Sequence, residues 1–327
     1  MKEPSENLMG IDIGGTKCAV TYGVKTGDAL TVVDKEMFPT TEVNETISHI
    51  CSATKAMMRK HGLNPDNTHA IGISCGGPLD SRRGVVMSPP NLPGWDDIPI
   101  TDIIQKETGI LCGLQNDANA CALAEWKFGA GRGTRDMVFL TFGTGMGAGI
   151  IANGQLLTGT NDNAGEVGHV RMAETGPVGY GKAGSFEGFV SGGGIAQLAR
   201  KYVSEVYQKG GSVDWCKADE INSLSARKVA EAAGHNDQTA LDIMHLSARY
   251  LGMGLSILID ILNPEVIVIG SIFTRNEAIM RPVIEDIIER EALDGARRVC
   301  RILPAELGES IGDYAALSIA ANIKQNN

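Results

Sequence analysis

Apolar residues along the chain alternate between short continuous runs and longer segments in which they recur every three or four positions. The first series opens with a strand-like run at 9–13, a glycine turn at 14–16 and two further strands. The segment 42–60 has the apolar spacing of a helix, and a strand at 110–115 leads directly into a helix at 117–128. Strands that alternate with helices predict an α/β domain.

A second series repeats this order of elements. It opens with strands at 137–142 and 148–152 on either side of a glycine turn at 143–145, and helical segments follow. The run 266–269 is entirely apolar, which is typical of a strand covered on both faces. The repeated architecture predicts two α/β domains with a cleft between them.

The two series also set the domain boundary. No Pro- or Ser-rich linker marks it, so we place it where the first series ends, near Glu125. The first domain is then 1–125 and the larger second domain is 126–310. We expect the last helix, within 311–327, to cross back and pack on the first domain.

Composition and charge narrow the class of protein. The net charge is −10 and the pI about 5.1, so the chain repels phosphate backbones and we expect no nucleic-acid partner. Its 7 scattered cysteines form no C-x-x-C pair, which fits the reduced thiols of a cytoplasmic protein. The N-terminus lacks an apolar signal sequence, and Asp260, Asn263 and Pro264 interrupt the longest apolar stretch, so we expect no membrane association.

The first glycine turn belongs to the run Asp12-Ile13-Gly14-Gly15-Thr16-Lys17, between two strands. Glycines let backbone N–H groups approach phosphate oxygens, while Thr16 and Lys17 add a hydroxyl donor and a positive charge. Asp12 is a candidate magnesium ligand, through water, because Mg²⁺ dehydrates reluctantly. The chain has no Walker-type loop G-x-x-x-x-G-K-[ST]. A tight hairpin turn without a ligand is the alternative interpretation.

The second glycine-rich turn is Gly143-Thr144-Gly145, in a run that continues to Gly149. It leads into a strand rather than a helix, which argues against a Rossmann dinucleotide site. Two hairpin turns of this kind, one in each domain, can hold a polyphosphate from both sides. The pair is therefore a more specific signal than either turn alone.

The run Asn116-Asp117-Ala118-Asn119 lies where a strand leads into a helix. Asp and Asn are ordinary helix caps, so capping is one interpretation. The other interpretation makes Asp117 a general base, because a carboxylate within hydrogen-bond reach can take the proton of an attacking hydroxyl.

Polar side chains also follow the second glycine turn, at Glu166, His169 and Glu187. Glycines at 165 and 168 argue against a helical metal site of the E-x-x-H type. Two carboxylates and an imidazole can instead surround a polyol with hydrogen bonds. A surface turn with an isolated histidine is the alternative.

The chain resembles the ROK family of repressors, open reading frames and sugar kinases in seven motifs that occur in the family's order. They are DIGGTK at 12–17, ISCGGPLD at 73–80, PNLPGW at 90–95, NDANACALAE at 116–125, FGTGMGAG at 142–149, GEVGH at 165–169 and NPEVIVIG at 263–270. The resemblance covers nearly the whole chain. It implies an actin-like, hexokinase-like ATPase fold with two ribonuclease-H-like domains, and a homodimer.

The resemblance also implies a role for each matched residue. Asp117 is the expected catalytic base. The residues expected to bind ATP and its phosphates, with Asp12 also holding magnesium through water, are Asp12, Gly14, Gly15, Thr16, Lys17, Gly143, Thr144, Gly145 and Gly270. The residues expected to bind the sugar are Gly77, Asn91, Asn116, Asp117, Glu166, His169 and Glu187.

One departure from the family pattern concerns zinc. Kinases that the chain resembles usually hold a structural zinc through the histidine of GEVGH and three cysteines, in a C-x-C-G-x-x-G-C-x-E pattern. The cysteine positions hold Val178, Tyr180 and Ser185 in this chain, and none of them supplies a thiolate. We therefore expect no structural zinc, and a His169 that serves the sugar alone.

These inferences together predict a glucokinase-like enzyme that uses ATP and magnesium to phosphorylate a hexose at its C6 hydroxyl. N-acetylmannosamine, N-acetylglucosamine and fructose are alternative acceptors. The family's sugar-sensing repressors carry a DNA-binding helix-turn-helix segment before the first glycine turn. In this chain eight residues precede Met9, and the net charge of the chain is negative, so we expect no such segment. A regulator without its DNA-binding domain, or a sugar-binding protein without activity, is the alternative from another class.

Overall fold

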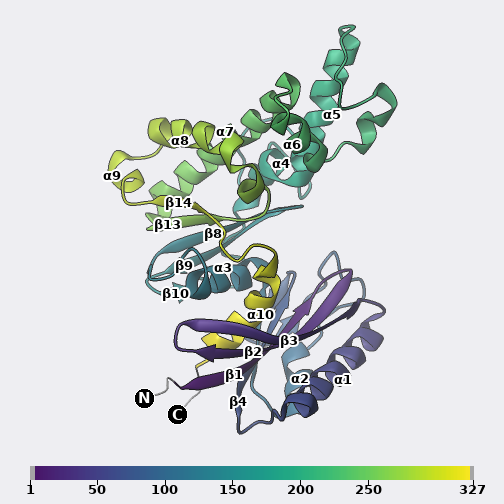
Figure 1. Cartoon of the computed structure of the whole chain (residues 1–327), viewed down its shortest axis with the longest axis vertical. Coiled ribbons are helices and arrows are strands. Elements are labelled where there is room, and N and C mark those ends of the chain that lie inside the picture. The colour runs from purple at the N-terminus through teal and green to yellow at the C-terminus, as the bar shows by residue number, and fades with distance from the viewer. Residues whose placement is uncertain (1–3, 325–327) are drawn as a thin grey trace. The chain divides into compact units, whose positions relative to one another are not determined.

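The computed structural model describes residues 4–324, which divide into two compact units. Unit 1 runs as far as Thr134 and also takes up Gly149–Ala164 and the segment from Glu306 onward. Unit 2 comprises Arg135–Ala148 and Gly165–Ala305. Figure 1 shows the chain with its helices and its longer strands, apart from β7, labelled.

The predicted boundary near Glu125 differs from this division, and Glu125 itself gives the reason. Its side chain is completely buried, and Oε2 accepts the backbone N–H of Ala130 at 2.8 Å. The same carboxylate accepts the N–H of Glu306 at 3.2 Å and that of Leu307 at 2.9 Å. One buried residue therefore ties both the segment after 125 and the returning C-terminal segment to unit 1.

The sheet of unit 1 has five strands in the order β3-β2-β1-β4-β7. The first three form an antiparallel meander, whereas β4 and β7 run parallel to β1. Their bounds are β1 Ser5–Ile13, β2 Lys17–Thr26, β3 Ala29–Pro39, β4 Thr68–Cys75 and β7 Cys112–Asn116. A small hairpin, β5 Leu79–Asp80 and β6 Val85–Val86, lies between β4 and β7 in the chain.

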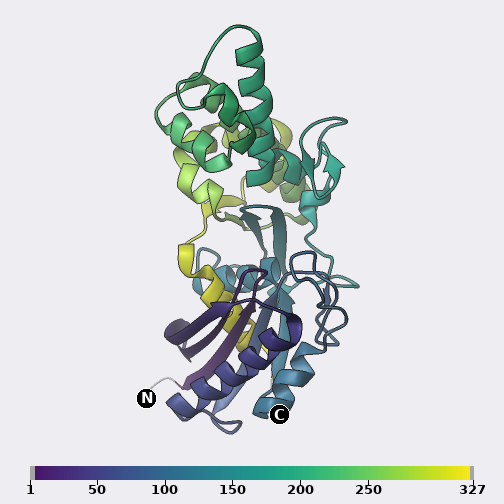
Figure 2. The ribbon, with the colours of Figure 1, turned by 90° about the vertical axis from the view of Figure 1, so that its right-hand side faces the viewer.

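Helices cover both faces of this sheet. Side chains of α1 Val43–His61 and α2 Ile100–Thr108 share one core with strand residues such as Ile11 and Ile73. On the other face α10 Ile311–Asn322 packs on β1, β4 and α3 Asp117–Phe128. Figure 2 shows α10, in yellow, against the purple strands from a second side.

The approach of α10 to the sheet depends on Gly72. A Cβ at this position would lie 2.0 Å from the carbonyl oxygen of Ala316. Because no real side chain tolerates that distance, only glycine lets the helix backbone reach β4. The last three residues of the segment predicted as the returning helix, 325–327, lie outside the described residues.

The second sheet has the strand order β10-β9-β8-β13-β14. Strand β13 pairs in parallel with β8 and β14, and β10 pairs antiparallel with β9, the strand in which the unit boundary falls. The bounds are β8 Met137–Phe142, β9 Met146–Ala152, β10 Gln155–Leu156, β13 Val266–Ile269 and β14 Arg301–Pro304. All four residues of β13 are buried, as its apolar sequence predicts.

Unit 2 is otherwise largely helical, and α7 is its central element. It contacts α4, α5, α6, α8 and α9. The helices are α4 Phe186–Val190, α5 Gly192–Gln208, α6 Ala226–Gly234, α7 Gln238–Leu262, α8 Ile272–Glu291 and α9 Asp294–Arg297. The short 3-10 turns of this unit are η1 Val167–His169 and η2 Ala218–Ser223, and η3 Gly308–Ser310 belongs to unit 1. A two-stranded hairpin, β11 Val178–Gly179 and β12 Lys182–Ala183, precedes α4. Over residues 4–324, no helix combines the length and apolar character needed to span a bilayer.

Candidate active site

The carboxyl ends of the parallel strands in unit 1 bring two predicted residues to one edge of the sheet. Asp12 pairs with Ser74 in the register of β1 and β4, and Ser74 pairs with Gln115 in that of β4 and β7. Asp117 follows β7 directly, as the first residue of α3. This edge is where ligands bind in open α/β sheets.

Asp117 is not the cap of its helix. The N-cap is Asn116, whose Oδ1 accepts the backbone N–H of Asn119 at 2.8 Å. The Asp117 carboxylate accepts the N–H of Ala118, at 2.8 Å, and remains accessible to solvent. Enough protein surrounds it that desolvation raises its pKa, against the lowering effect of the backbone N–H groups. A carboxylate that is accessible, poorly solvated and not used for capping suits proton transfer.

Asp12 lies in an electrostatically crowded place. Burial raises its pKa to about 6, and the negative charges of Asp117 and Asp313 add to this, while Lys35 and Lys17 oppose it. Asp313, at the start of α10, is itself paired with Lys35 at 2.6 Å. A partly buried carboxylate among like charges is stabilised by a cation, and carboxylate oxygens suit Mg²⁺. The surroundings of Asp12 therefore fit the magnesium role that the sequence predicts for it.

The first glycine turn is closed by hydrogen bonds and lies against Asn91. The N–H of Gly14 donates to the carbonyl of Lys17 at 3.1 Å, and the hydroxyl of Thr40 donates to the carbonyl of Gly14. A Cβ at Gly15 would lie 2.5 Å from the carbonyl oxygen of Asn91. Glycine is thus required here for close approach, and the structure brings the predicted phosphate turn and the predicted sugar ligand Asn91 together.

Gly77 lies in the same neighbourhood. A Cβ at the preceding residue, Gly76, would lie 3.4 Å from the Asn91 side-chain oxygen, whereas a Cβ at Gly77 would meet no atom within 4 Å. The backbone beside Asn91 is therefore open at Gly77, which leaves room for a ligand.

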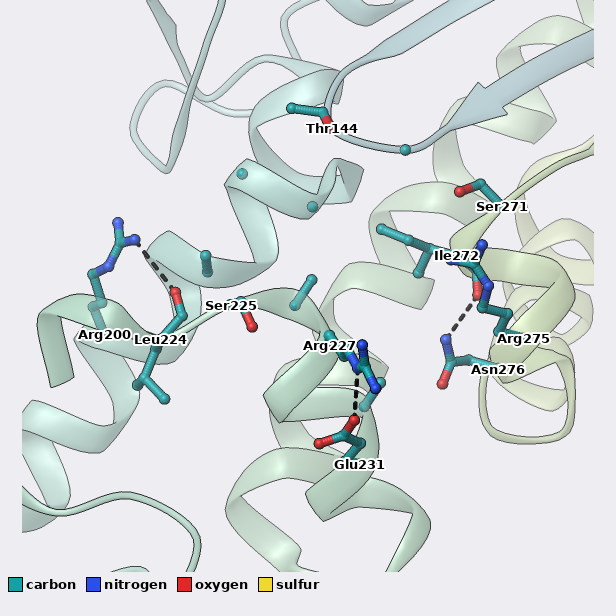
Figure 3. A pocket seen from close by; sticks show the side chains of 16 residues that line it. Thr144, Arg200, Leu224, Ser225, Arg227, Glu231, Ser271, Ile272, Arg275 and Asn276 are labelled. Atoms are coloured by element: carbon teal, nitrogen blue, oxygen red, sulfur yellow. Dashed lines mark hydrogen bonds and ion pairs between the residues drawn. The ribbon is translucent and has the colours of Figure 1, made fainter. Parts of the chain in front are cut away.

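The second glycine turn, in unit 2, borders a cavity of about 960 Å³. Gly143 and Thr144 line it together with Gly192 and Gly193, the first two residues of α5. The N–H of Gly192 donates to the carbonyl of Gly143 at 2.8 Å, so the turn and the N-terminus of α5 form one rigid wall. Figure 3 shows Thr144 at this wall of the cavity.

Sequence reasoning missed most of the polar side chains of this cavity. They come from three helices, and they are Arg200 of α5, Arg227 and Glu231 of α6, and Arg275 and Asn276 of α8, with Ser225 as the N-cap of α6 (Figure 3). Arg227 is paired with Glu231 at 2.8 Å. The Nε of Arg200 is buried without a hydrogen-bond partner in the described part of the chain. Each helix supplies only one or two of these residues, and the three helices are far apart in the sequence, so no linear motif signals them.

Gly270, predicted near the adenosine, does not itself line the cavity. The next two residues, Ser271 and Ile272, do. A Cβ at Gly270 would meet the Phe139 ring at 3.5 Å, and one at Gly143 would meet the Ser271 hydroxyl at 3.8 Å. The end of β13 therefore leads the chain to the cavity, and Ser271 is the first residue after the strand that lines it.

Glu187, in the first turn of α4, is attached to the second glycine turn. Its Oε2 accepts the backbone N–H of Met146 at 3.0 Å, and a Cβ at Gly145 would lie 2.9 Å from the same oxygen. A Cβ at Gly168 would lie 3.2 Å from the Glu187 Cβ. The segment with Glu166 and His169 thus runs beside Glu187. Glu166 and His169 are both exposed, and the E-x-x-H segment forms the short turn η1 rather than an α-helix.

The three positions at which the family pattern has cysteine lie in a helix cap and a hairpin in this chain. Ser185 is buried and is the N-cap of α4, because its Oγ accepts the N–H of Gly188 at 3.1 Å. Val178 and Tyr180 belong to the β11–β12 hairpin. Between residues 4 and 324, no group of three or more His, Cys, Asp or Glu side chains is arranged to hold a metal ion.

Known proteins resemble the chain over most of its length. It is 33% identical to a glucokinase of Halalkalibacterium halodurans over 84% of this chain and 83% of that one. The solved structure of a ROK glucokinase from Streptomyces griseus, in complex with glucose and AMPPNP, is 27% identical, with a TM-score of 0.74 over 97% of this chain and 100% of that one. The Escherichia coli DNA-binding regulator NagC is 26% identical over 88% of this chain and 70% of its own.

These similarities confirm the predicted fold class. The two five-stranded mixed sheets with their helices correspond to the actin-like ATPase fold of the ROK glucokinase structure. The family model described as "ROK family" matches residues 8–323. The chain therefore belongs to the ROK family.

Proposed function

We propose that the chain is an ATP-dependent hexose kinase that transfers the γ-phosphoryl group of ATP to the C6 hydroxyl of its sugar. The observation that carries this proposal is the Asp117 carboxylate, which is accessible, has a raised pKa, and is released from capping by Asn116. The similarity to glucokinases, at 33% identity for the protein of H. halodurans, supports the same activity.

Asp117 acts on the acceptor. Its carboxylate accepts the proton of the C6 hydroxyl as the sugar oxygen forms its bond to the γ-phosphorus and the bond to the leaving ADP breaks. Magnesium bound with ATP would neutralise charge on the phosphates. Asp12 would hold that magnesium through water. The Gly14 N–H is already bonded to the Lys17 carbonyl, so Gly15 and Thr16 would offer their N–H groups to the phosphates.

The nucleotide has a suitable site in the cavity of unit 2. About 960 Å³ lies within the range of small-molecule sites, which is roughly 300–1,000 Å³. Thr144 lies beside the N-terminus of α5, and the positive end of the helix dipole favours a phosphate there. The N–H groups of Gly192, Gly193 and Gly194 are themselves bonded to Gly143, Thr144 and Ser191. Arg200, with its buried and unpaired Nε, suits a polyanionic ligand.

Six residues besides Asp117 are the proposed sugar ligands. Asn91, Asn116 and Gly77 lie in unit 1, and Glu166, His169 and Glu187 lie in unit 2. Glucose is the acceptor favoured by the similarity to glucokinases, and N-acetylmannosamine, N-acetylglucosamine and fructose are the alternatives.

The test is a coupled assay of ADP release with each of these sugars and with none. Turnover that depends on one sugar and on Mg²⁺, and that is lost in Asp117→Asn, supports the proposal. Sugar binding without ADP release in the wild type contradicts it, and favours a sugar sensor. The similarity to NagC makes that sensor the second candidate.

We also propose a homodimer. Ile257 and Ile261 lie one turn apart on α7 and are 39% and 73% exposed, and Leu293 beyond α8 is 68% exposed. Leu293 is held to α7, because its N–H donates to Asp260 at 2.8 Å. Exposed apolar side chains grouped in this way are typical of interfaces. Light scattering after gel filtration, with Ile261→Glu as the disrupting variant, tests the proposal.

A further inference from the structure

The hairpin between β11 and β12 has an unfavourable residue at its tip. Its two-residue turn is Tyr180-Gly181, and both residues have positive φ, 45° and 75°. Turns of this kind favour Asn, Asp or Gly at the first position, and a bulky residue there is a conformational outlier. The β9–β10 hairpin of the same chain follows the rule, with Asn153-Gly154 at φ of 52° and 73°. Tyr180 is therefore not the residue that the turn itself selects.

Burial does not explain Tyr180 either, because its side chain is 75% exposed. An exposed aromatic ring in a strained backbone conformation contributes little to folding. Strained residues of this kind persist chiefly where they serve a function.

The location of the ring indicates which function. The Tyr180 ring lies edge-on to the His169 imidazole, with centroids 6.0 Å apart and planes at 77°. Next in the hairpin, Lys182 donates from Nζ to the carbonyl oxygen of His169 at 2.7 Å. On the other strand, a Cβ at Gly179 would lie 2.8 Å from the Cβ of Glu187. The hairpin thus contacts two of the three residues expected to bind the sugar in unit 2.

We propose that Tyr180 is an acceptor-specificity residue, whose ring holds the His169 imidazole edge-on and packs against the C–H face of the bound sugar. This inference rests on the proposed function, because it requires a sugar beside His169 and Glu187.

The chemistry of a pyranose supports this role. Its hydroxyls radiate toward carboxylates and imidazole, which are supplied by Glu166, Glu187 and His169, whereas its axial C–H groups form an apolar face. An aromatic ring with an open face offers large contact area at low entropic cost. Val170, which follows His169 in the chain, and Val178 of β11 are also exposed apolar side chains. The polar side chains bind the hydroxyls on one side of the sugar, and the Tyr180 ring contacts its apolar face. Together they distinguish sugars by the orientation of their hydroxyls.

Two substitutions separate this role from a structural one. Tyr180→Asn removes the ring but suits the backbone, since Asn tolerates positive φ, so the melting temperature should stay the same or rise. The KM for the preferred sugar should rise about tenfold, with the KM for ATP within twofold of the wild type. Tyr180→Phe keeps the ring, and its sugar KM should stay within twofold.

A second measurement does not depend on turnover. The ring current of Tyr180 acts on the His169 imidazole, whose centroid lies 6.0 Å away. The NMR resonances of that imidazole should therefore shift in Tyr180→Asn and stay close to the wild type in Tyr180→Phe. Unchanged resonances in Tyr180→Asn overturn the contact with His169.

The outcomes for the two proposals are distinguishable. A wild-type enzyme that phosphorylates a hexose, with an equal sugar KM in Tyr180→Asn, overturns the role of Tyr180 and leaves the kinase proposal standing. A loss of sugar affinity in Tyr180→Phe as large as in Tyr180→Asn also overturns it. A wild-type protein that neither binds nor phosphorylates any sugar overturns both.

Discussion

The Oε2 atom of Glu187 accepts the backbone N–H of Met146 at 3.0 Å, and so joins the start of α4 to the end of the second glycine turn. One carboxylate oxygen of a predicted sugar ligand is therefore already used to hold a predicted phosphate turn. Glu187 is thus expected to affect both the stability of the turn and the binding of the sugar.

The substitutions Glu187→Gln and Glu187→Ala should separate these effects. Gln keeps an oxygen acceptor for the Met146 N–H, so its melting temperature should be close to that of the wild type. Ala leaves that N–H without its partner, which costs about 1–3 kcal/mol of folding free energy. Both should raise the sugar KM about tenfold, since both remove the carboxylate. A sugar KM unchanged in Glu187→Gln would restrict Glu187 to holding the turn.

Asp117→Asn should lower kcat by a factor of about 10² or more, the usual contribution of a general base. Because burial raises the pKa of Asp117, its ionised form costs folding free energy at neutral pH, so the variant should melt at the same or a higher temperature. Asp102→Asn is the matched control, because Asp102 is an exposed aspartate in the first turn of another helix, α2, and the variant should keep full activity. Near-normal turnover in Asp117→Asn would remove Asp117 from the mechanism.

Asp12 should make stability depend on both pH and magnesium. Its pKa is raised from 3.8 to about 6, so its contribution to stability is full below pH 3.8 and is lost as the pH rises through about 6. The ionised carboxylate then costs at most about 3 kcal/mol at neutral pH. Asp12→Asn should therefore raise the melting temperature more at pH 7.5 than at pH 5.0.

Magnesium should act in the same pH range. Mg²⁺ should raise the wild-type melting temperature at pH 7.5, where Asp12 is ionised, and much less at pH 5.0, where it is largely protonated. In Asp12→Asn this difference should disappear. A magnesium effect of equal size at both pH values, or one that persists in the variant, contradicts a site at Asp12.

Neighbouring glycines at the start of α5 offer a test of the nucleotide cavity. A Cβ at Gly193 would meet its nearest atom at 3.7 Å, whereas one at Gly194 would lie 1.9 Å from the carbonyl oxygen of Gly188. Gly193→Ala should be neutral or stabilise by up to about 1 kcal/mol, and Gly194→Ala should cost about 1–3 kcal/mol or more. Gly193→Leu extends into the cavity, and should raise the KM for ATP about tenfold without changing the sugar KM. An unchanged ATP KM in Gly193→Leu would place the nucleotide elsewhere.

The features predicted well from the sequence are those that a short segment determines. The strand-to-helix step at Asp117 follows from local spacing, and Gly62 ends α1 with φ of 65°, as a helix C-cap glycine does. The sequence does not determine which of several neighbouring polar residues caps the N-terminus of a helix. Thr41 precedes α1 and threonine commonly caps helices, yet Glu42 caps this one, because its side chain accepts the N–H of Asn44 at 3.1 Å. The Thr41 hydroxyl instead lies 3.3 Å from that of Thr46.

Features that depend on distant segments were not predictable. A local choice was also open, since Asn116 and Asp117 are both capable of capping α3, and the hydrogen bond from Asn119 to Asn116 identifies Asn116 as the cap. The domain boundary depended on a buried contact between Glu125 and Leu307, far apart in the sequence. The arginines of the cavity lie on separate helices, and only the packing of α5, α6 and α8 gathers them.

The last prediction is that hydrogen bonds of Ser185 and Lys182, rather than a metal ion, hold the loop that carries His169. Ser185 stands at a position where the family pattern has cysteine, and its buried Oγ caps α4 through the N–H of Gly188. Ser185→Ala should therefore lower stability by about 1 kcal/mol, and Ser185→Thr should largely restore it.

Lys182 adds a hydrogen bond to the His169 carbonyl at 2.7 Å, so the loop has polar contacts that require no ion. A zinc chelator should then leave the melting temperature of the wild type unchanged, because removal of a structural zinc normally unfolds its surroundings. Stoichiometric zinc in the purified protein by elemental analysis, or a lower melting temperature with the chelator, would show that a metal supports this loop after all.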